Sequence, residues 1–473
     1  MTHLRLPTAR VPTVAGTVWL GAAPLLRPAA AALVLLLAGC VSASREEQGA
    51  LDRVRATAAQ LHPAGGRPEL PVLTADSPLA DYLRYALLNH PQVEAAFDDW
   101  RGAVLAIAPA RALPDPQFTF QADIADTVTS FMPGLMFDLM APGKRAAMGR
   151  EATAASNVAY RTYTATVLRV AADVRKAWIE LAYAGDVHGL YRETITAVDT
   201  ALALTNAEYA TGRGMANFEK QVRLQNLAAQ HHAHHAAVAD RLVAARAQFK
   251  SALGLSPADP DPPWPQPTLT ATPLPPAPEL WQRTLAANPG LAQMRAMVEM
   301  AIAGVDVARK AGTPDFTLGA MVDVKADPLM VRPTATVTLP VWREKIRALV
   351  GAAEARRDAA VARVSAEQLN LAAELAQMLY MVNESDRMLA YMDGSALPNL
   401  DRSIASVAAG VQSGMASPAM ISEIQLMAID MRHERLEVLH SREIAATGLM
   451  LLTASVAPAG APLPPDPAAP PGI

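Results

Sequence analysis

Cysteine, aromatic residues and long apolar runs are scarce in this chain of 473 residues. A single cysteine, Cys40, excludes a disulfide framework and a cysteine-based metal site. Aromatic residues make up 5% of the sequence and hydrophobic residues 51%, which favours alanine- and leucine-rich helices over an all-β core. The net charge of −4 gives no case for a nucleic-acid partner. No uncharged apolar run reaches the ~18 residues of a transmembrane helix, so any membrane crossing would have to be made by strands.

The one cysteine ends an N-terminal apolar segment. The run over 29–38 is too short to span a bilayer and has the length of a signal-peptide core. Leu37-Ala38-Gly39-Cys40 resembles a bacterial lipobox, in which the cysteine becomes the lipidated first residue of the mature protein. We therefore predict a signal peptide over 1–39, lipidation at Cys40 and a loosely ordered arm over 40–76. A plain signal peptide or a buried thiol are the alternatives, and the long leader leaves the start codon open.

Proline divides the rest of the chain. Residues 256–278 contain ten prolines, which exclude a helix and indicate an extended linker. Residues 456–473 are also rich in proline and predict a disordered tail. Between these two stretches and before the first, 77–255 and 279–455 form two segments of similar length.

The two segments repeat the same landmarks in the same order. LLNHPQVEAA around Pro91 matches LAANPGLAQM around Pro289, an offset of 289 − 91 = 198 residues. PQFTF matches PDFTL at the same offset, and the triplet Gly-Met-Ala starts at Gly214 and again at Gly414, 414 − 214 = 200 residues later. This spacing indicates a duplicated unit of about 200 residues rather than a short solenoid repeat.

Each unit contains two segments in which polar and apolar residues alternate. They cover 117–124 and 135–139 in the first unit, and 316–325 and 334–339 in the second. A period of two with one apolar face is the signature of a strand, and lengths near ~9–11 residues suit a tilted strand crossing a bilayer. Four strands cannot close a barrel, and lipid does not tolerate an open edge, so a membrane-spanning sheet requires several copies of the chain.

Long stretches after the strands predict helices. Residues 143–211 fit one helix of roughly 100 Å at ~1.5 Å per residue, and Asn217 is a good N-cap for a second helix over 217–253. In the second unit, 342–397 predicts a long helix that kinks near Gly394 and Pro398.

Both Gly-Met-Ala triplets fall between predicted helices. Gly414 should end the second long helix, Ser417 should cap the next, and Pro418 fits the first helical position. We therefore predict a tight helix-to-helix turn at each triplet.

The sequence resembles the TolC-type outer-membrane efflux protein family over roughly 77–455. The resemblance rests on Asn89-His90-Pro91 with Asn288-Pro289, PQFTF with PDFTL, MAPGKRAAM at 140–148, the two turns, and SALGL at 251–255. It implies a mainly α fold with a membrane β-barrel portion. In this fold a homotrimer forms a 12-stranded barrel in the outer membrane and a long α-helical barrel in the periplasm.

The same resemblance implies a passive exit duct without catalysis or cofactor. Such a duct works with a periplasmic adaptor protein and an inner-membrane pump. Pro398 in ALPNLDRS resembles the branch that serves heavy-metal and other resistance-nodulation-division pumps, so metal cations are one class of cargo. A duct for type I secretion or drug efflux is the alternative. A lipid-anchored periplasmic coiled-coil scaffold is disfavoured, because it has no need for alternating strands.

In the family, adaptor hairpins dock between the helix tips. The corresponding residues here are Gly212, Gly214, Met215, Ala216 and Asn217 at the first turn, and Gly414, Met415, Ala416 and Ser417 at the second. Small residues also simply permit a tight turn, and both interpretations stay open.

The family often carries acidic rings just inside the second tip. This chain has Met420 and Glu423 at those positions. Three copies of Glu423 at a pore entrance would concentrate negative potential and favour cations. A solvated surface glutamate is the alternative.

Two clusters invite a metal-binding interpretation. His231 and His235 in HHAHH have the i, i+4 spacing of many zinc ligands, but no third ligand is evident, so a solvated face or adventitious binding is favoured. Met420, Met427 and Met431 fall on one helical stripe. Thioethers suit Cu(I), although methionine more often fills gaps in helix packing. We therefore predict no dedicated metal site.

An enzyme is the main rival class. The sequence contains no GxSxG, HExxH, P-loop or Cys–His pair. His433 and Glu434 are adjacent but face different ways on a helix. The sequence favours a conducting function over a catalytic one.

Overall fold

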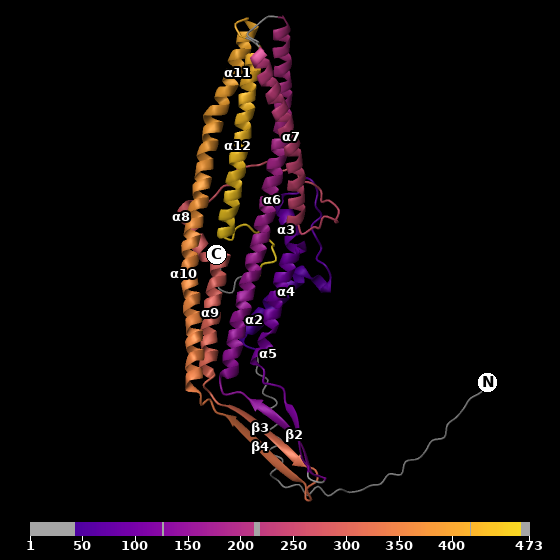
Figure 1. Cartoon of the computed structure of the whole chain (residues 1–473), viewed down its shortest axis with the longest axis vertical. Helices are drawn as coiled ribbons and strands as arrows, with labels where there is room; N and C mark the ends of the chain where they lie inside the picture. The colour runs from indigo at the N-terminus through magenta and orange to yellow at the C-terminus, as the bar shows by residue number, and fades with distance from the viewer. Residues whose placement is uncertain (1–42, 125–126, 212–217, 417, 465–473) are drawn as a thin grey trace, which may run out of the picture. The chain divides into compact units, whose positions relative to one another are not determined.

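The computed structural model describes residues 43–124, 127–211, 218–416 and 418–464. The described residues from Arg45 onward belong to one compact unit. In it, α2 (Arg45–Leu61) and the short η1 (Pro63–Gly65) precede two similar series of elements (Figure 1). The first series is α3 (Leu79–Asn89), α4 (Pro91–Leu105), α5 (Ile107–Arg111), β1 (Gln117–Ile124), β2 (Val128–Leu139), α6 (Lys144–Thr211) and α7 (Phe218–Ala252). The second is α8 (Ala277–Ala287), α9 (Pro289–Lys310), β3 (Asp315–Asp323), β4 (Met330–Thr338), α10 (Arg343–Tyr391), the π-helical turn η2 (Met392–Ala396), α11 (Leu397–Gln412) and α12 (Pro418–Leu452).

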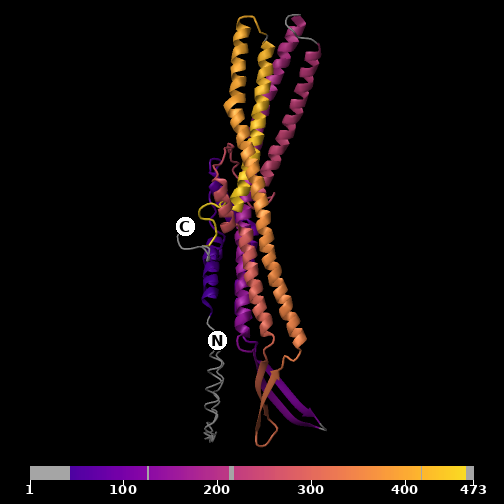
Figure 2. The same ribbon diagram turned by 90° about the vertical axis from the view of Figure 1, so that its left-hand side faces the viewer.

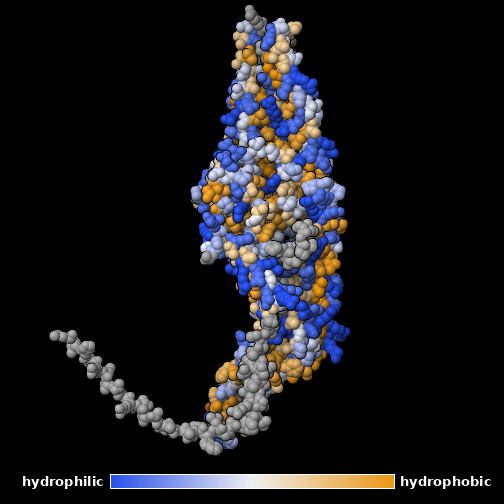
Figure 3. Space-filling model, turned by 180° about the vertical axis from the view of Figure 1, so that it is seen from behind, coloured by the Kyte–Doolittle hydropathy of each residue, from blue (hydrophilic) through white to orange (hydrophobic). Residues whose placement is uncertain are grey.

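The four strands form one antiparallel sheet in the order β1-β2-β3-β4. Its register places apolar residues opposite one another on one face of all four strands. These pairs include Phe118 with Leu135, Phe137 with Leu318, and Phe316 with Val337. Phe118 is 70% exposed and Leu318 47%, so the face is uncovered in the single chain. Figure 3 shows apolar residues at this end of the molecule.

The long helices run lengthwise from the sheet to the turns at the opposite end (Figures 1 and 2). α6 has 68 residues and α10 has 49, while α7 and α12 have 35 each. The predicted kink near Gly394 and Pro398 is confirmed as the π-helical turn η2, and Pro398 falls in the first turn of α11, where a missing N–H costs little. Among the described residues, no helix is both long enough and apolar enough to cross a membrane.

The main hydrophobic core lies where α2, α3 and α4 pack on α6. Trp100 of α4 and Tyr163 of α6 are at most 1% exposed, and their rings stack 5.4 Å apart. We expected a loosely ordered arm over 40–76. Instead, α2 is a regular helix that inserts Val54 and Leu61 into this core.

The proline-rich segments are extended, but they are packed against the helices. Tyr82 Oη donates a hydrogen bond to the carbonyl oxygen of Pro263 in the linker, at 2.8 Å. We expected a disordered tail over 456–473, yet residues 456–464 lie on α6, where Tyr163 Oη donates to the Pro462 carbonyl at 2.5 Å. Residues 465–473 lie outside the described residues. Proline removes a donor and leaves its carbonyl free, so buried tyrosine hydroxyls can hold such segments.

Candidate functional site

The turn between α11 and α12 lies at the end of the helices far from the sheet (Figure 2). Gly414 has a φ of +74°, in the left-handed region that glycine adopts without a Cβ clash. The amides of Met415 and Ala416 donate to the Gly410 carbonyl at 2.8 and 3.1 Å, which satisfies an otherwise free group at the helix end. Met415 is 84% exposed. The predicted turn is confirmed, and its role in adaptor docking stays a prediction.

Several predicted site residues lie outside the described residues. They are Cys40, Gly212, Gly214, Met215, Ala216, Asn217 and Ser417. α6 ends at Thr211 and α7 begins at Phe218, so the first Gly-Met-Ala triplet does lie between two helices. Near that end, Gln221 Nε2 donates to Asn206 Oδ1 at 2.9 Å and ties α7 to α6.

The predicted entrance residues lie on the first turns of α12. Met420 is 45% exposed. The Glu423 carboxylate lies 3.0 Å from Lys220 Nζ and 3.7 Å from Arg223 Nη2, both on α7. Two cations therefore offset the charge of Glu423, and the negative potential that we expected from three copies is reduced. Sequence reasoning missed this pairing because α7 and α12 are about 200 residues apart.

The methionines divide into two groups. Met392 is fully buried, and Met378 and Met381 pack against a core cluster of α10 and α12, as gap-filling methionines do. Met427 is 59% exposed, like Met420 on the same helix. Met420 and Met427 therefore present exposed thioethers on α12.

The HHAHH segment is less solvated than we expected. His232 and His234 are exposed, but His231 and His235 are half-buried against α6. The ring of His235 stacks on that of His188, with centroids 4.9 Å apart. Within the described residues, no group of three or more His, Cys, Asp or Glu side chains could hold a metal ion.

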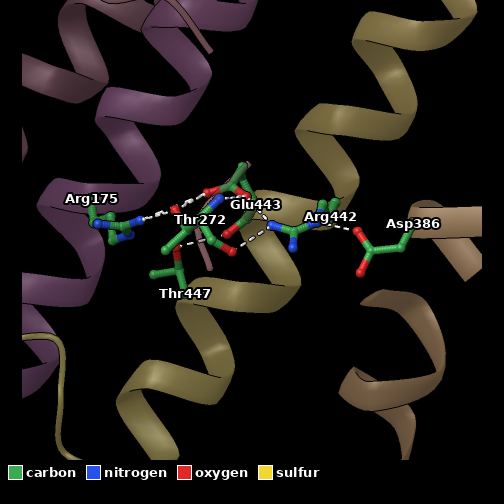
Figure 4. A network of polar contacts seen from close by, with 6 residues as sticks. All are labelled: Arg175, Thr272, Asp386, Arg442, Glu443 and Thr447. Atoms are coloured by element: carbon green, nitrogen blue, oxygen red, sulfur yellow. Dashed lines mark hydrogen bonds and ion pairs between the residues drawn. The ribbon is translucent and has the colours of Figure 1, made fainter. Parts of the chain in front are cut away.

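A buried polar network joins the linker to the long helices (Figure 4). Glu443 of α12 is 2% exposed and accepts hydrogen bonds from Thr272 N at 2.9 Å, Thr272 Oγ1 at 2.5 Å and Arg442 Nη1 at 2.6 Å. Arg442 also donates to Asp386 of α10 at 2.5 Å. Through Thr272, the linker is therefore fixed to α12, and through Arg442 the same point is fixed to α10.

The network continues to the first series of elements. Arg175 of α6 donates to Thr272 Oγ1 at 2.7 Å and lies 3.7 Å from Glu443. Burial lowers the pKa of Arg175, and the charge of Glu443 opposes that shift. Thr447 Oγ1 donates to the backbone carbonyl of Glu443 at 2.8 Å. Sequence reasoning missed all of these residues, because adjacent arginine and glutamate on a helix are typical of a solvated face.

The second series of elements carries a recognisable domain. Residues 280–455 match the family model described as outer membrane efflux protein. This part of the chain is therefore a domain of that family. No curated protein sequence matches the chain.

The fold of the chain is similar to that of solved outer membrane channels. The open-state MtrE outer membrane channel of Neisseria gonorrhoeae is 17% identical, with a TM-score of 0.67 over 80% of this chain and 89% of its own. The CmeC outer membrane channel of Campylobacter jejuni is 14% identical, with a TM-score of 0.65 over 81% and 86%. VceC, an outer membrane protein of Vibrio cholerae, is 16% identical, with a TM-score of 0.64 over 80% and 96%. At these identities the likeness shows the fold alone, and it confirms the predicted fold class.

Proposed function

We propose that this outer membrane efflux protein is the outer-membrane duct of a tripartite efflux system. It is a passive exit for substrates that an inner-membrane pump delivers through a periplasmic adaptor. The observation that carries the proposal is the uncovered apolar face that continues across all four strands. The same chain carries helices of up to 68 residues, which extend away from the sheet. The family match supports the same conclusion.

The proposed assembly is a homotrimer. The ends of the sheet, β1 and β4, have no partner strand within the described part of the chain. Unpaired backbone groups are not tolerated in lipid, so β4 of one copy pairs with β1 of the next, and three copies of four strands close a barrel of twelve. Lipidation at Cys40 adds an anchor in the outer membrane.

The helical tips are the proposed contact with the adaptor. The exposed turn at Gly414, Met415 and Ala416 supports this role, because a rigid turn presents side chains without a loss of backbone entropy. Met420 and Glu423 follow just inside the proposed entrance. Because Lys220 and Arg223 pair with Glu423, cation preference at this level should be modest.

The pump sets most of the choice of cargo. Met420 and Met427 are exposed on α12 and favour soft metal cations as one class. Replacing both by leucine in a strain that depends on this duct should lower copper or silver tolerance without changing the amount of protein. Unchanged tolerance would favour drug or protein export.

Membrane fractionation tests the duct. We expect the protein in the outer-membrane fraction as a detergent-stable trimer. The Cys40→Ala variant should lose its lipid and still form the trimer through its strands. A soluble Cys40→Ala monomer would contradict the duct and support a lipid-anchored periplasmic scaffold.

A further inference from the structure

Seven of the ten histidines lie along the surface where α7 and α12 pack on α6. Five of them surround or adjoin one tyrosine of α6, Tyr191, and His234 of α7 stacks on its ring with centroids 6.1 Å apart. His433 of α12 lies 4.4 Å from Tyr191 between ring centroids, and His231 of α7 lies 6.2 Å from it. One turn away, His188 of α6 stacks on His235 of α7 at 4.9 Å. We call Tyr191, His188, His231, His235 and His433 the histidine layer.

Four ring nitrogens of this layer are buried without a hydrogen-bond partner among the described residues. They are His188 Nδ1, His231 Nδ1, His235 Nε2 and His433 Nε2. Burial lowers the pKa of His188, His231 and His433. The positive charges of Arg192 and Arg246 lower the pKa of His188 further. A proton on any of these rings would place a charge in a site built for apolar ring packing.

Few charges face the layer to compensate. Asp430 of α12 raises the pKa of His231 and His433, but burial outweighs it at both. The Arg432–Glu193 pair at 3.8 Å and the His232–Asp199 pair at 3.6 Å are solvent-exposed and contribute little. The titratable and charged groups around the layer are Arg192 and Glu193 on α6, His234 and Arg246 on α7, and Asp430 and Arg432 on α12.

The layer holds the part of α12 that carries the second tip. α11, the partner of α12 in this hairpin, has no buried residue among those described. Above the layer, Leu426 of α12 packs with Val198 of α6 and Ala228 of α7, and the pairs to Glu423 lie at the surface. Ser422, Ala428 and Ile429 of α12 are also buried. Loss of the layer therefore weakens the attachment of α12 to α6 and α7 at His433.

The opposite end of the same surface responds differently to acid. His440 Nε2 lies 2.9 Å from Glu180 Oε2, and Arg241 Nε donates to the same carboxylate at 2.8 Å. The hydrogen bond to His440 is the main cause that lowers the pKa of Glu180 to about 2, with Arg241 adding to it and burial opposing it. Glu180 thus stays ionised in mild acid, and Arg241 keeps its charge as the partner of this carboxylate.

We infer that the histidine layer is an acid-sensitive contact between the two helical hairpins, and that its protonation releases α12 and the second tip from α6 and α7. The release is a property of the fold. Its consequence for adaptor docking and for the width of the entrance rests on the proposed function.

The direction follows from the shifts. The pKa of His188, His231 and His433 is lower when the helices are packed than when they are released. At a pH above 6.5, the ordinary histidine pKa, these rings are neutral in both states and the packing is fully stable. This stability is lost as the pH falls through 6.5 toward the lower pKa of the packed state. Mild acid should therefore loosen the tip half of α12 while the Glu180 end stays closed.

Hydrogen exchange of the purified full-length protein in detergent tests the inference. Wild type is compared with the triple variant His188→Gln, His231→Gln, His433→Gln at about pH 7.5 and about pH 5, with a chelator present. Comparison at equal pH removes the intrinsic dependence of exchange on acid. We expect amides of 420–436 to exchange about fivefold faster in wild type than in the triple variant near pH 5, and at similar rates near pH 7.5.

Two further variants make the outcome decisive even if the triple variant is unstable. His433→Lys, which is charged throughout, should show fast exchange over 420–436 already near pH 7.5. His232→Gln removes an exposed histidine of α7, next to His231, and should behave as wild type. Equal protection of wild type at both pH values, or an equal response of His232→Gln, would overturn the inference. Neither result depends on export activity, so the proposed duct could stand or fall separately.

Discussion

Single residues show how strongly this chain relies on buried charge. Glu443 contacts Arg442, Arg175 and Thr272 within a site that is almost closed to solvent. A buried ion pair contributes little more to the free energy of unfolding than well-packed apolar residues would. Removing one partner, however, leaves the other buried charges unpaired, which is strongly destabilising. The consequence is that α6, α10, α12 and the linker depend on one carboxylate.

Glu443→Ala should be strongly destabilising. It leaves the buried cations Arg442 and Arg175 with fewer acceptors, at a cost of about 3–5 kcal/mol. The loss would appear as a lower denaturation midpoint of the detergent-solubilised protein. Glu437→Ala, at an exposed position of the same helix, is the matched control and should change stability by less than about 0.5 kcal/mol. Similar midpoints for both variants would contradict the role of the network.

Residue-level features were the hardest to predict from sequence. Small residues and Gly414 identified the second turn, because a left-handed φ is a local property of glycine. Lys220 as a partner of Glu423, Arg175 as a partner of Glu443 and Tyr191 as a partner of His433 could not be predicted, because each comes from a helix far away in the sequence. Their pairing depends on how the helices are packed, which periodicity does not encode.

At the scale of elements, local patterns predicted most of the fold. β1 begins and ends where alternation predicts, and α6 begins one residue later than expected. β3 ends at Asp323 although the alternation continues to residue 325, because the strand pairing stops there. The packing of α2 and of residues 456–464 could not be predicted, because proline content and polarity report on helix formation and not on docking.

The sheet offers a test of which face meets lipid. Ala335 lies in the middle of β4 on the apolar face, opposite Leu318, and Thr336 points to the other face. Ala335→Arg should impair insertion, since arginine on the lipid face costs about 2–4 kcal/mol near the bilayer centre. Thr336→Arg should be tolerated. The measurement is the fraction of protein recovered as trimer from the outer membrane. Equal recovery of the two variants would contradict the assignment of the apolar face to lipid.

At the scale of the whole molecule, residues 456–464 pack against the core of the first series of elements. Val456 is buried in the core formed by α2, α4 and α6, and Tyr163 of that core binds the carbonyl of Pro462. The last residues of the second series thus complete the core of the first.

Deleting residues 456–473 should therefore destabilise the first series of elements, although it removes no helix. The loss of the buried Val456 and of the hydrogen bonds from Tyr163 to Pro462 and from Tyr160 to Pro464 amounts to about 3 kcal/mol. The denaturation midpoint and the protease resistance of α2 would report it. Deleting only residues 465–473 is the control, which leaves Val456 and Pro462 in place. If the protein without 456–473 were as stable as the full-length protein, the segment would be dispensable.

The order β1-β2-β3-β4 gives each copy two different edges. In a ring closed through β4 and β1, every copy uses one edge toward each neighbour. A copy with a damaged β1 still offers an intact β4, so it joins the ring and prevents it from closing. If intact and damaged copies were made in equal amounts and mixed freely, only roughly one trimer in eight would be free of damage. Damage to one edge should therefore act as a genetically dominant trait, even in a cell that still carries an intact gene.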